Sequence, residues 1–294
     1  MRILIEIFQA IIALFGRKRR PKAMEPATSF YVEEIPPEPQ YTYQSLGIDK
    51  DGVEQFINED FSEEELVHAR EQFRIDNINK NIRCKETEVS IDWEDTVLWS
   101  DERGLECKST QYKTVSGDRR PSIDKIVVHW DGCLSSNQCA KVLRDRGLSA
   151  HFCIDNDGTI YQLMDTNHVA WHARGVNSKS IGIEISNAVY MKHARRYRPA
   201  RPRIKESMLH GKTFQEHLGF YDVQVAALKE LIKALCSFYN IPLEYPNQDG
   251  ELIRNAIKTS SFTGVICHYH VTKNKVDPAC LDLAKLIEEI KNEA

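Results

Sequence analysis

The chain has 294 residues, of which 41% are hydrophobic, so it is long and apolar enough for one large domain or two of ordinary size. Its net charge of −4 excludes a protein that binds nucleic acid over its whole surface. The charge is uneven, because residues 24–110 carry 22 acids against 8 Lys and Arg, whereas residues 190–212 carry 8 Lys and Arg against one acid.

Residues 1–20 predict an amphipathic helix at a membrane surface. Arg2, Glu6 and Gln9 share one face of a helical wheel, and isoleucine, leucine and phenylalanine cover the opposite face. The basic cluster at residues 17–20 adds attraction to anionic lipid head groups. An atypical signal anchor and a helix that packs on a partner stay open as alternatives, because the apolar stretch is shorter than the ~20 residues of a membrane span.

The next hundred residues show no chemistry. Residues 21–47 are rich in proline and acid and predict an extended linker. Residues 48–120 predict a small acidic accessory region. Within it, Ser62–Glu65 has the form of a capping box, which predicts a helix that runs to about Asn79.

From residue 121 to the C-terminus, strands alternate with helices. Strands are predicted at 126–129 and 180–185, a β-hairpin at 149–162, and helices at 135–146, 221–239 and 279–293. The pattern predicts an α/β domain over residues 121–294, with a central mixed β-sheet flanked by helices. Residues 188–219 interrupt it as a long basic insertion. We expect this insertion to attract anionic substrate or envelope polymers, because it lacks the interleaved aromatics of a nucleic-acid surface.

Three side chains in this domain have the types and positions of a catalytic zinc site. Such a site takes three protein ligands from histidine and carboxylate or thiolate, and leaves the fourth position open. His129 ends one predicted strand, His268 directly follows another at residues 265–267, and Asp277 lies on the next loop. Glu184 is the single acid inside the apolar strand at 180–185, where acids are rare unless they are paired or functional.

Five motifs around these residues resemble a known family. In chain order they are VVH, SAHF-x-I-x-x-DG-x-I-x-Q, AWHA, SIGIE and H-x6-K-x-D, within residues 124–289. Together they resemble the zinc-dependent N-acetylmuramoyl-L-alanine amidases, whose type-2 amidase fold is shared with the peptidoglycan recognition proteins.

The resemblance implies a Zn²⁺ ion held by His129, His268 and Asp277. It also implies that Glu184 acts as general base and that Lys275 stabilises the oxyanion that forms when water adds to the amide. The gap between His268 and Lys275 is one residue shorter than in the cytosolic branch of the family. His270 therefore stays open as an alternative second ligand.

A groove for sugar and stem peptide is expected beside the metal. The resemblance and the residue types assign it His151, Trp171, His172 and Asn177, and a tryptophan face can pack on a pyranose ring. Trp171 is as readily explained as a core residue, and His151 as a residue behind the site.

Eight cysteines without a C-x-x-C pair exclude a structural zinc knot. Cys133 and Cys139 have the spacing of a bridge found in peptidoglycan recognition proteins, which would indicate an oxidising compartment. Two free thiols are the alternative.

The expected function is a peptidoglycan hydrolase that cleaves the amide between N-acetylmuramic acid and the L-alanine of the stem peptide, with Zn²⁺ as cofactor. Peptidoglycan or a muropeptide is the expected partner, the membrane surface a further one through residues 1–20, and nucleic acid is not expected. Two alternatives remain: a non-catalytic module of the same fold that binds muropeptide, and a membrane-tethered interaction protein.

Overall fold

The computed structural model describes residues 43–48, 54–58, 80–116 and 120–293. The expected helices over residues 1–20 and 62–79 lie outside these ranges, as does most of the linker at 21–47. In the described N-terminal part, β1 (Tyr43–Ile48) and β2 (Glu54–Asn58) form an antiparallel ribbon. No helix in the described part of the chain is long and apolar enough to cross a bilayer.

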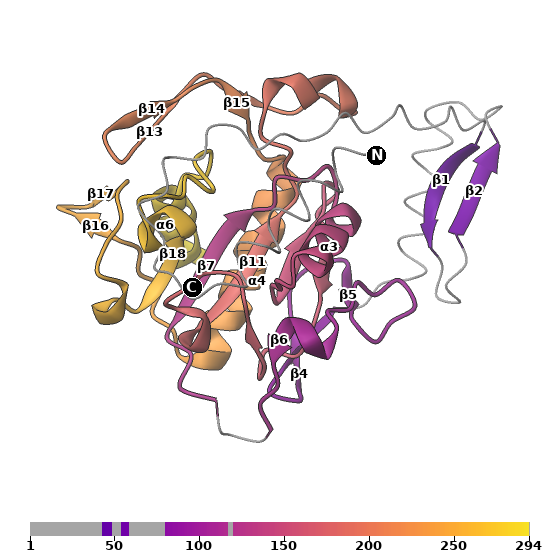
Figure 1. The fold of residues 1–294 in the computed structure, drawn as a ribbon, viewed down its shortest axis with the longest axis horizontal. Coiled ribbons are helices and arrows are strands. Elements are labelled where there is room, and N and C mark those ends of the chain that lie inside the picture. Colours follow the sequence, from indigo (N-terminus) through magenta and orange to yellow (C-terminus); the bar gives the residue numbers. More distant parts are fainter. Residues whose placement is uncertain (1–42, 49–53, 59–79, 117–119, 294) are drawn as a thin grey trace, which may run out of the picture. The chain divides into compact units, whose positions relative to one another are not determined.

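A six-stranded mixed sheet forms the centre of the fold, as the sequence predicted (Figure 1). The first four strands in the sheet order are parallel to one another, and β9 is antiparallel to β8 but parallel to β5. In spatial order the strands are β18 (Gly264–Cys267), β7 (Lys125–Trp130), β11 (Ser180–Ile185), β8 (Phe152–Ile154), β9 (Ile160–Gln162) and β5 (Thr96–Leu98).

Alternation along the strands decides which side chains face the core and which face the site. Ile126 and Val128 of β7 pack in the main core, whereas Val127 belongs to a separate cluster on the opposite face. The same alternation puts Ile183 of β11 in the main core. Side chains at even and odd positions of a strand point to opposite faces, so His129 and Glu184 share the face away from the main core.

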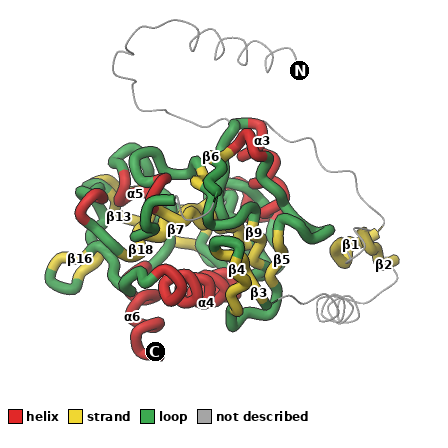
Figure 2. The backbone as a smooth tube through the Cα atoms, turned by 90° about the horizontal axis from the view of Figure 1, so that it is seen from below, coloured by secondary structure: helices red, strands yellow, loops and turns green. Residues whose placement is uncertain are grey.

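Helices cover both faces of the sheet (Figure 2). The predicted helices at 221–239 and 279–293 are α4 (Asp222–Tyr239) and α6 (Leu283–Glu293), whose apolar residues complete the main core. The predicted helix at 135–146 is α3 (Ser136–Asp145), which packs on the other face. The Ser135 side chain caps α3 by accepting the backbone N–H of Gln138. Each fully buried leucine of α4, such as Leu231, stabilises the fold by about 1.5–3 kcal/mol.

The fold begins before residue 121, where we had expected the amidase-like domain to start. Residues 96–98 form β5 at the edge of the central sheet, and the hairpin β3 (Asn81–Cys84) and β4 (Thr87–Ser90) contributes Ile82 to the main core. Further on, β6 (Tyr112–Lys113) pairs with β10 (Val169–Ala170). Residues 80–116 are therefore part of the same fold, and the correction follows from long-range strand pairing that local sequence does not show.

The basic insertion is folded rather than a loose loop. It carries two small antiparallel ribbons, and Arg201 is buried between the rings of Tyr197 and Tyr221, 4.4 Å from each ring centre. Its ribbons are β12 (Arg203–Ile204) with β15 (His217–Leu218), and β13 (Ser207–Leu209) with β14 (Lys212–Phe214). The remaining short elements are β16 (Asn247–Gln248), β17 (Glu251–Leu252), α5 (His268–Val271) and the 3-10 turns at Ser109–Gln111, Asn177–Lys179, Met191–Arg196 and Thr259–Ser261.

Candidate metal and active site

Two neighbouring parallel strands and one loop bring His129, His268 and Asp277 together. His129 lies near the end of β7, and His268 directly follows β18, which pairs with β7. Their Nδ1 atoms lie 3.1 and 2.9 Å from Oδ2 of Asp277, and one ligand atom of each residue lies within 4.8 Å of the others. All three side chains are buried.

This donor set fits a zinc ion. Two imidazole nitrogens and one carboxylate are typical ligands, and bonds of ~2.1 Å in a tetrahedron separate ligand atoms by about 3.4 Å, close to the distances seen here. Burial, together with the nearby His268, lowers the pKa of His129 to about 4, so its imidazole is neutral and can coordinate. Burial opposes ionisation of Asp277, but its hydrogen bonds with His129 and His268 prevail and hold its pKa below the ordinary range.

A chain of hydrogen bonds orients His129 from behind. With Nδ1 directed at the metal position, Nε2–H of His129 donates to Nδ1 of His172 at 3.0 Å. Nε2–H of His172 then donates to Oγ of Ser180 at 3.1 Å, and Ser180 donates to the carbonyl of Val176 at 2.9 Å. The tautomers of both histidines are assigned from the direction of this series of hydrogen bonds. Such a support fixes the ring orientation of a metal-binding histidine.

The absence of a side chain at Gly182 leaves room for the His172 ring. A Cβ atom at residue 182 would lie 2.5 Å from the His172 ring, which is too close for any side chain. We did not identify Gly182 or Ser180 from the sequence. A glycine inside an apolar strand indicates a close approach of another group, so SIGIE did contain a signal for Gly182.

Glu184 lies directly across the sheet from His129. The two residues are in register on parallel strands, and Oε1 of Glu184 is 4.0 Å from Nδ1 of His129. Only 9% of Glu184 is exposed. Burial, followed by the negative charge of Asp277, raises the pKa of Glu184 well above its ordinary value.

Lys275 is exposed on the loop that carries Asp277, and its charge acts on both Glu184 and His129. The backbone carbonyl of Lys275 accepts a hydrogen bond from Nε2–H of His210, at 2.9 Å. His210 follows β13, so the basic insertion contacts the loop on which Lys275 lies.

His270, the alternative second ligand, has both ring nitrogens engaged by the backbone. Its Nδ1 accepts the N–H of Cys267 at 2.9 Å, and Nε2–H donates to the carbonyl of Ile253 at 2.6 Å. His268, and not His270, joins the three-residue cluster.

His151 is completely buried, so of the two roles that the sequence left open, facing substrate or lying behind the site, the structure favours the second. Its Nδ1 accepts the N–H of Gly182 at 3.0 Å, and Nε2–H donates to the carbonyl of His168 at 3.0 Å. With no exposed surface and both nitrogens used, the side chain holds the sheet to the loop before β10 and offers nothing to a ligand.

The other expected groove residues lie on the loop after β10. Trp171 is 38% exposed, and His172 is half-buried beside His129. Oδ1 of Asn177 accepts the backbone N–H groups of His172 and Ala173, at 3.3 and 2.7 Å. Asn177 therefore fixes the backbone of the loop on which Trp171 and His172 lie.

Arg120 is a buried residue that the sequence reading missed. Its guanidinium donates to the carbonyls of Thr166, His168, Asn177 and Ser180. Burial lowers its pKa to about 10, so it stays charged at neutral pH. By these bonds it joins the loop before β10 to the turn that carries Ser180. No local pattern around residue 120 signals this role, because all four carbonyls are at least 46 residues away.

Cys133 and Cys139 are buried, and like the other six cysteines they form no disulfide. The sequence allowed either a bridge between these two residues or two free thiols, and the structure has two free thiols.

Residues 118–280, more than half of the chain, match the family model described as N-acetylmuramoyl-L-alanine amidase. The chain belongs to this family. It is an N-acetylmuramoyl-L-alanine amidase, a hydrolase of the amide between N-acetylmuramic acid and L-alanine in peptidoglycan. The expected fold, family and reaction are confirmed. A comparison with curated proteins gives no match.

Several solved structures are similar to the amidase. An endolysin amidase, LysCS from Clostridium intestinale, is 20% identical, with a TM-score of 0.41 over 68% of this chain and 94% of that one. AmpDH3 from Pseudomonas aeruginosa, solved with an anhydromuramic pentapeptide, is 21% identical, with a TM-score of 0.39 over 63% and 66%. Peptidoglycan recognition protein SA from Drosophila is 16% identical, with a TM-score of 0.35 over 67% and 90%.

Proposed function

We propose that the amidase works with one zinc ion held by His129, His268 and Asp277. The observation that carries the proposal is the convergence of these three ligand atoms within 4.8 Å, with an acid on the adjacent strand. When bound, zinc supplies a Lewis acid and lowers the pKa of a coordinated water to about 7.

Glu184 is the general base in this proposal. It takes a proton from the attacking water and returns it to the leaving amine of L-alanine. Its raised pKa, caused first by burial, makes its carboxylate a stronger base than that of an exposed glutamate. Its register with His129 supports the assignment, because the two side chains project from adjacent strands on one face.

Lys275 stabilises the negative charge that develops on the amide oxygen. Its ammonium is exposed on the loop of Asp277, and its field reaches Glu184 and His129. The attraction between this ammonium and the amide oxygen is stronger in the transition state than in the ground state, and this difference accelerates the reaction.

The substrate lies along the loop after β10. Trp171 offers an exposed ring face for a sugar, while His172 and Asn177 shape the loop from below. Because His151 has no exposed surface, it is not part of this proposal.

The test combines metal content with digestion of a purified monomeric muropeptide. Wild type should hold about one zinc and release the stem peptide. Glu184→Gln should keep the zinc and lose about 10²–10⁴-fold in kcat, while Asp277→Ala should lose the zinc. If zinc-loaded wild type binds muropeptide and releases no peptide, the proposed roles of Glu184 and Lys275 are wrong.

We also propose that residues 1–20 attach the enzyme to an anionic membrane surface, on the strength of their helical amphipathicity and basic cluster. Deletion of these residues should abolish sedimentation with phosphatidylglycerol vesicles and leave muropeptide cleavage unchanged. Equal sedimentation of both forms would refute the attachment.

A further inference from the structure

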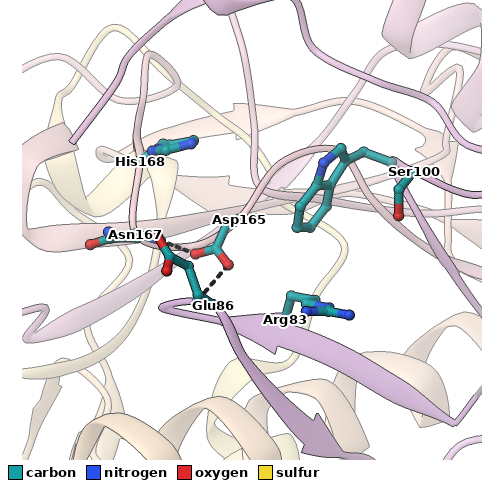
Figure 3. A pocket seen from close by; sticks show the side chains of 7 residues that line it. Arg83, Glu86, Ser100, Asp165, Asn167 and His168 are labelled. Atoms are coloured by element: carbon teal, nitrogen blue, oxygen red, sulfur yellow. Dashed lines mark hydrogen bonds between the residues drawn. The ribbon is translucent and has the colours of Figure 1, made fainter. Parts of the chain in front are cut away.

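A polar pocket of about 360 Å³ lies between the β3–β4 hairpin and the segment that joins β9 to β10 (Figure 3). One wall comes from Arg83 and Glu86 of the β3–β4 hairpin and from Trp99 and Ser100 after β5. The other wall comes from residues 165–168, between β9 and β10. The first wall precedes residue 118, where the family match begins, so the matched part of the chain does not form this pocket alone.

Hydrogen bonds from backbone N–H groups to one carboxylate hold the pocket in shape. Lys85 and Glu86 both have left-handed backbones, with φ of 51° and 64°, an arrangement that costs about 1 kcal/mol or more per residue. The Asp165 carboxylate supports it by accepting the N–H groups of Lys85 and Glu86, at 3.0 and 2.8 Å. Figure 3 shows Asp165 between Glu86 and Asn167, whose N–H it also accepts at 2.6 Å.

The two walls are tied to each other. The side chain of Gln162 accepts the N–H of Arg83 at 2.7 Å and donates to its carbonyl at 2.6 Å. The His168 ring stacks on Tyr112, with centroids 4.9 Å apart and planes 12° apart. A pocket that is already formed loses little entropy when it binds a ligand.

The lining has the chemistry of a saccharide site. A half-buried indole, Trp99, offers an apolar face, and Arg83, Ser100 and Glu86 offer donors and acceptors around it. A pyranose ring has one apolar face and a rim of hydroxyl and acetamido groups, which match this combination. The volume is at the small end of the range for ligand pockets, about 300–1,000 Å³, so it suits one sugar rather than a long chain.

The pocket and the reaction centre lie at opposite edges of the central sheet. The pocket follows the ends of β5 and β9, which run antiparallel to β7, whereas His129 lies near the end of β7. The six residues of β7 span about 20 Å, so a glycan strand of several saccharides, and not a single sugar, is needed to reach both places.

We propose that this pocket binds a saccharide of the peptidoglycan glycan strand at a distance from the unit being cut. This inference rests on the proposed function, since it takes peptidoglycan as the substrate. It assigns residues 80–100 a role in recognising polymer, which a released monomeric fragment would not need.

The test compares cleavage of purified sacculi with cleavage of a monomeric muropeptide, together with binding of chitotetraose measured by chemical-shift perturbation in NMR. Trp99→Ala should raise KM for sacculi about tenfold and lose chitotetraose binding, with monomer cleavage within twofold of wild type. Arg83→Ala, a change at an exposed side chain, should act in the same direction. Lys285→Ala, at an exposed position of α6, is the control and should change neither.

Unchanged sacculus kinetics in both pocket variants would overturn the inference. So would an equal loss on both substrates, which indicates a structural defect, or a wild type that shows no perturbation with chitotetraose at residues 83–100. Failure of wild type to cut the monomeric muropeptide would instead refute the proposed function, so the two failures are distinguishable.

Discussion

Nε2 of His129 lies 3.0 Å from Nδ1 of His172, and Gly182 is the residue that makes room for this contact. The pair links the proposed metal position to Ser180 and to the loop after β10. His172 therefore supports the proposed metal ligand His129.

Replacing His172 by alanine should weaken zinc binding about 10–100-fold, because His129 loses the group that fixes its ring. Competition with a chromophoric chelator measures the affinity. Lys179→Ala, an exposed residue on the neighbouring turn, is the matched control. An unchanged zinc affinity in His172→Ala would show that His129 needs no such support.

Removing the charge of Lys275 should slow chemistry without releasing the metal. Lys275→Ala should lower kcat about 10²–10³-fold, the usual effect of deleting one oxyanion-stabilising group, while zinc content stays at wild-type level. Lys273→Ala is the control, because this lysine is exposed on the same loop. If Lys273→Ala and Lys275→Ala reduce kcat equally, the effect is one of general charge.

Loss of Arg120 should destabilise the whole domain. Arg120→Ala leaves the buried carbonyls of Thr166 and Ser180 without their donor, and hydrogen bonds to charged groups contribute about 1.5–3 kcal/mol each. We expect the free energy of unfolding in urea to fall by about 3 kcal/mol or more. Arg144→Ala, at an exposed position of α3, should change it by less than about 0.5 kcal/mol.

Asp155 should make the protein less stable as pH rises from 4 to 6. Burial, followed by repulsion from Asp157, raises its pKa from 3.8 to about 6, so the folded state holds a proton that the unfolded state releases. The stabilisation is complete below pH 3.8 and is lost as pH rises through 6, and it amounts to about 3 kcal/mol.

The Asp155→Asn variant isolates this effect. Its amide oxygen can still accept the N–H groups of Ser136 and Asn156, but it does not titrate. Urea unfolding at pH 4, 5, 6 and 7 should show a shallower loss of stability in the variant than in wild type. Parallel curves would mean that another group is responsible.

Truncation tests where the fold begins. A chain that starts at residue 121 lacks β5 and the core residue Ile82, so we expect it to show no cooperative thermal transition. A chain that starts at residue 80 should unfold cooperatively and cut muropeptide. If the shorter chain is as stable as the longer one, residues 80–116 are dispensable to the core.

Sequence patterns predicted the elements whose residues are close together in the chain. Short apolar runs rich in β-branched residues predicted both β7 and β11, and the strand ends predicted that His129 and His268 would meet. The roles of Arg120 and His151 could not be predicted in this way, because their hydrogen-bond partners are carbonyl and amide groups that every residue carries. The position of β5 was missed for the same reason, since its short apolar run pairs with a strand 64 residues later.

The register of β11 on β7 has a consequence for how this enzyme can diverge. Glu184 and His129 project from adjacent strands, whose separation of about 4.8 Å is set by backbone hydrogen bonds. Mutation of neighbouring side chains cannot tune that spacing, so the reactive geometry is inherited with the sheet. New substrate preferences must then arise in segments outside the sheet, such as residues 188–219 and the hairpin at 81–90, which can vary without disturbing the chemistry.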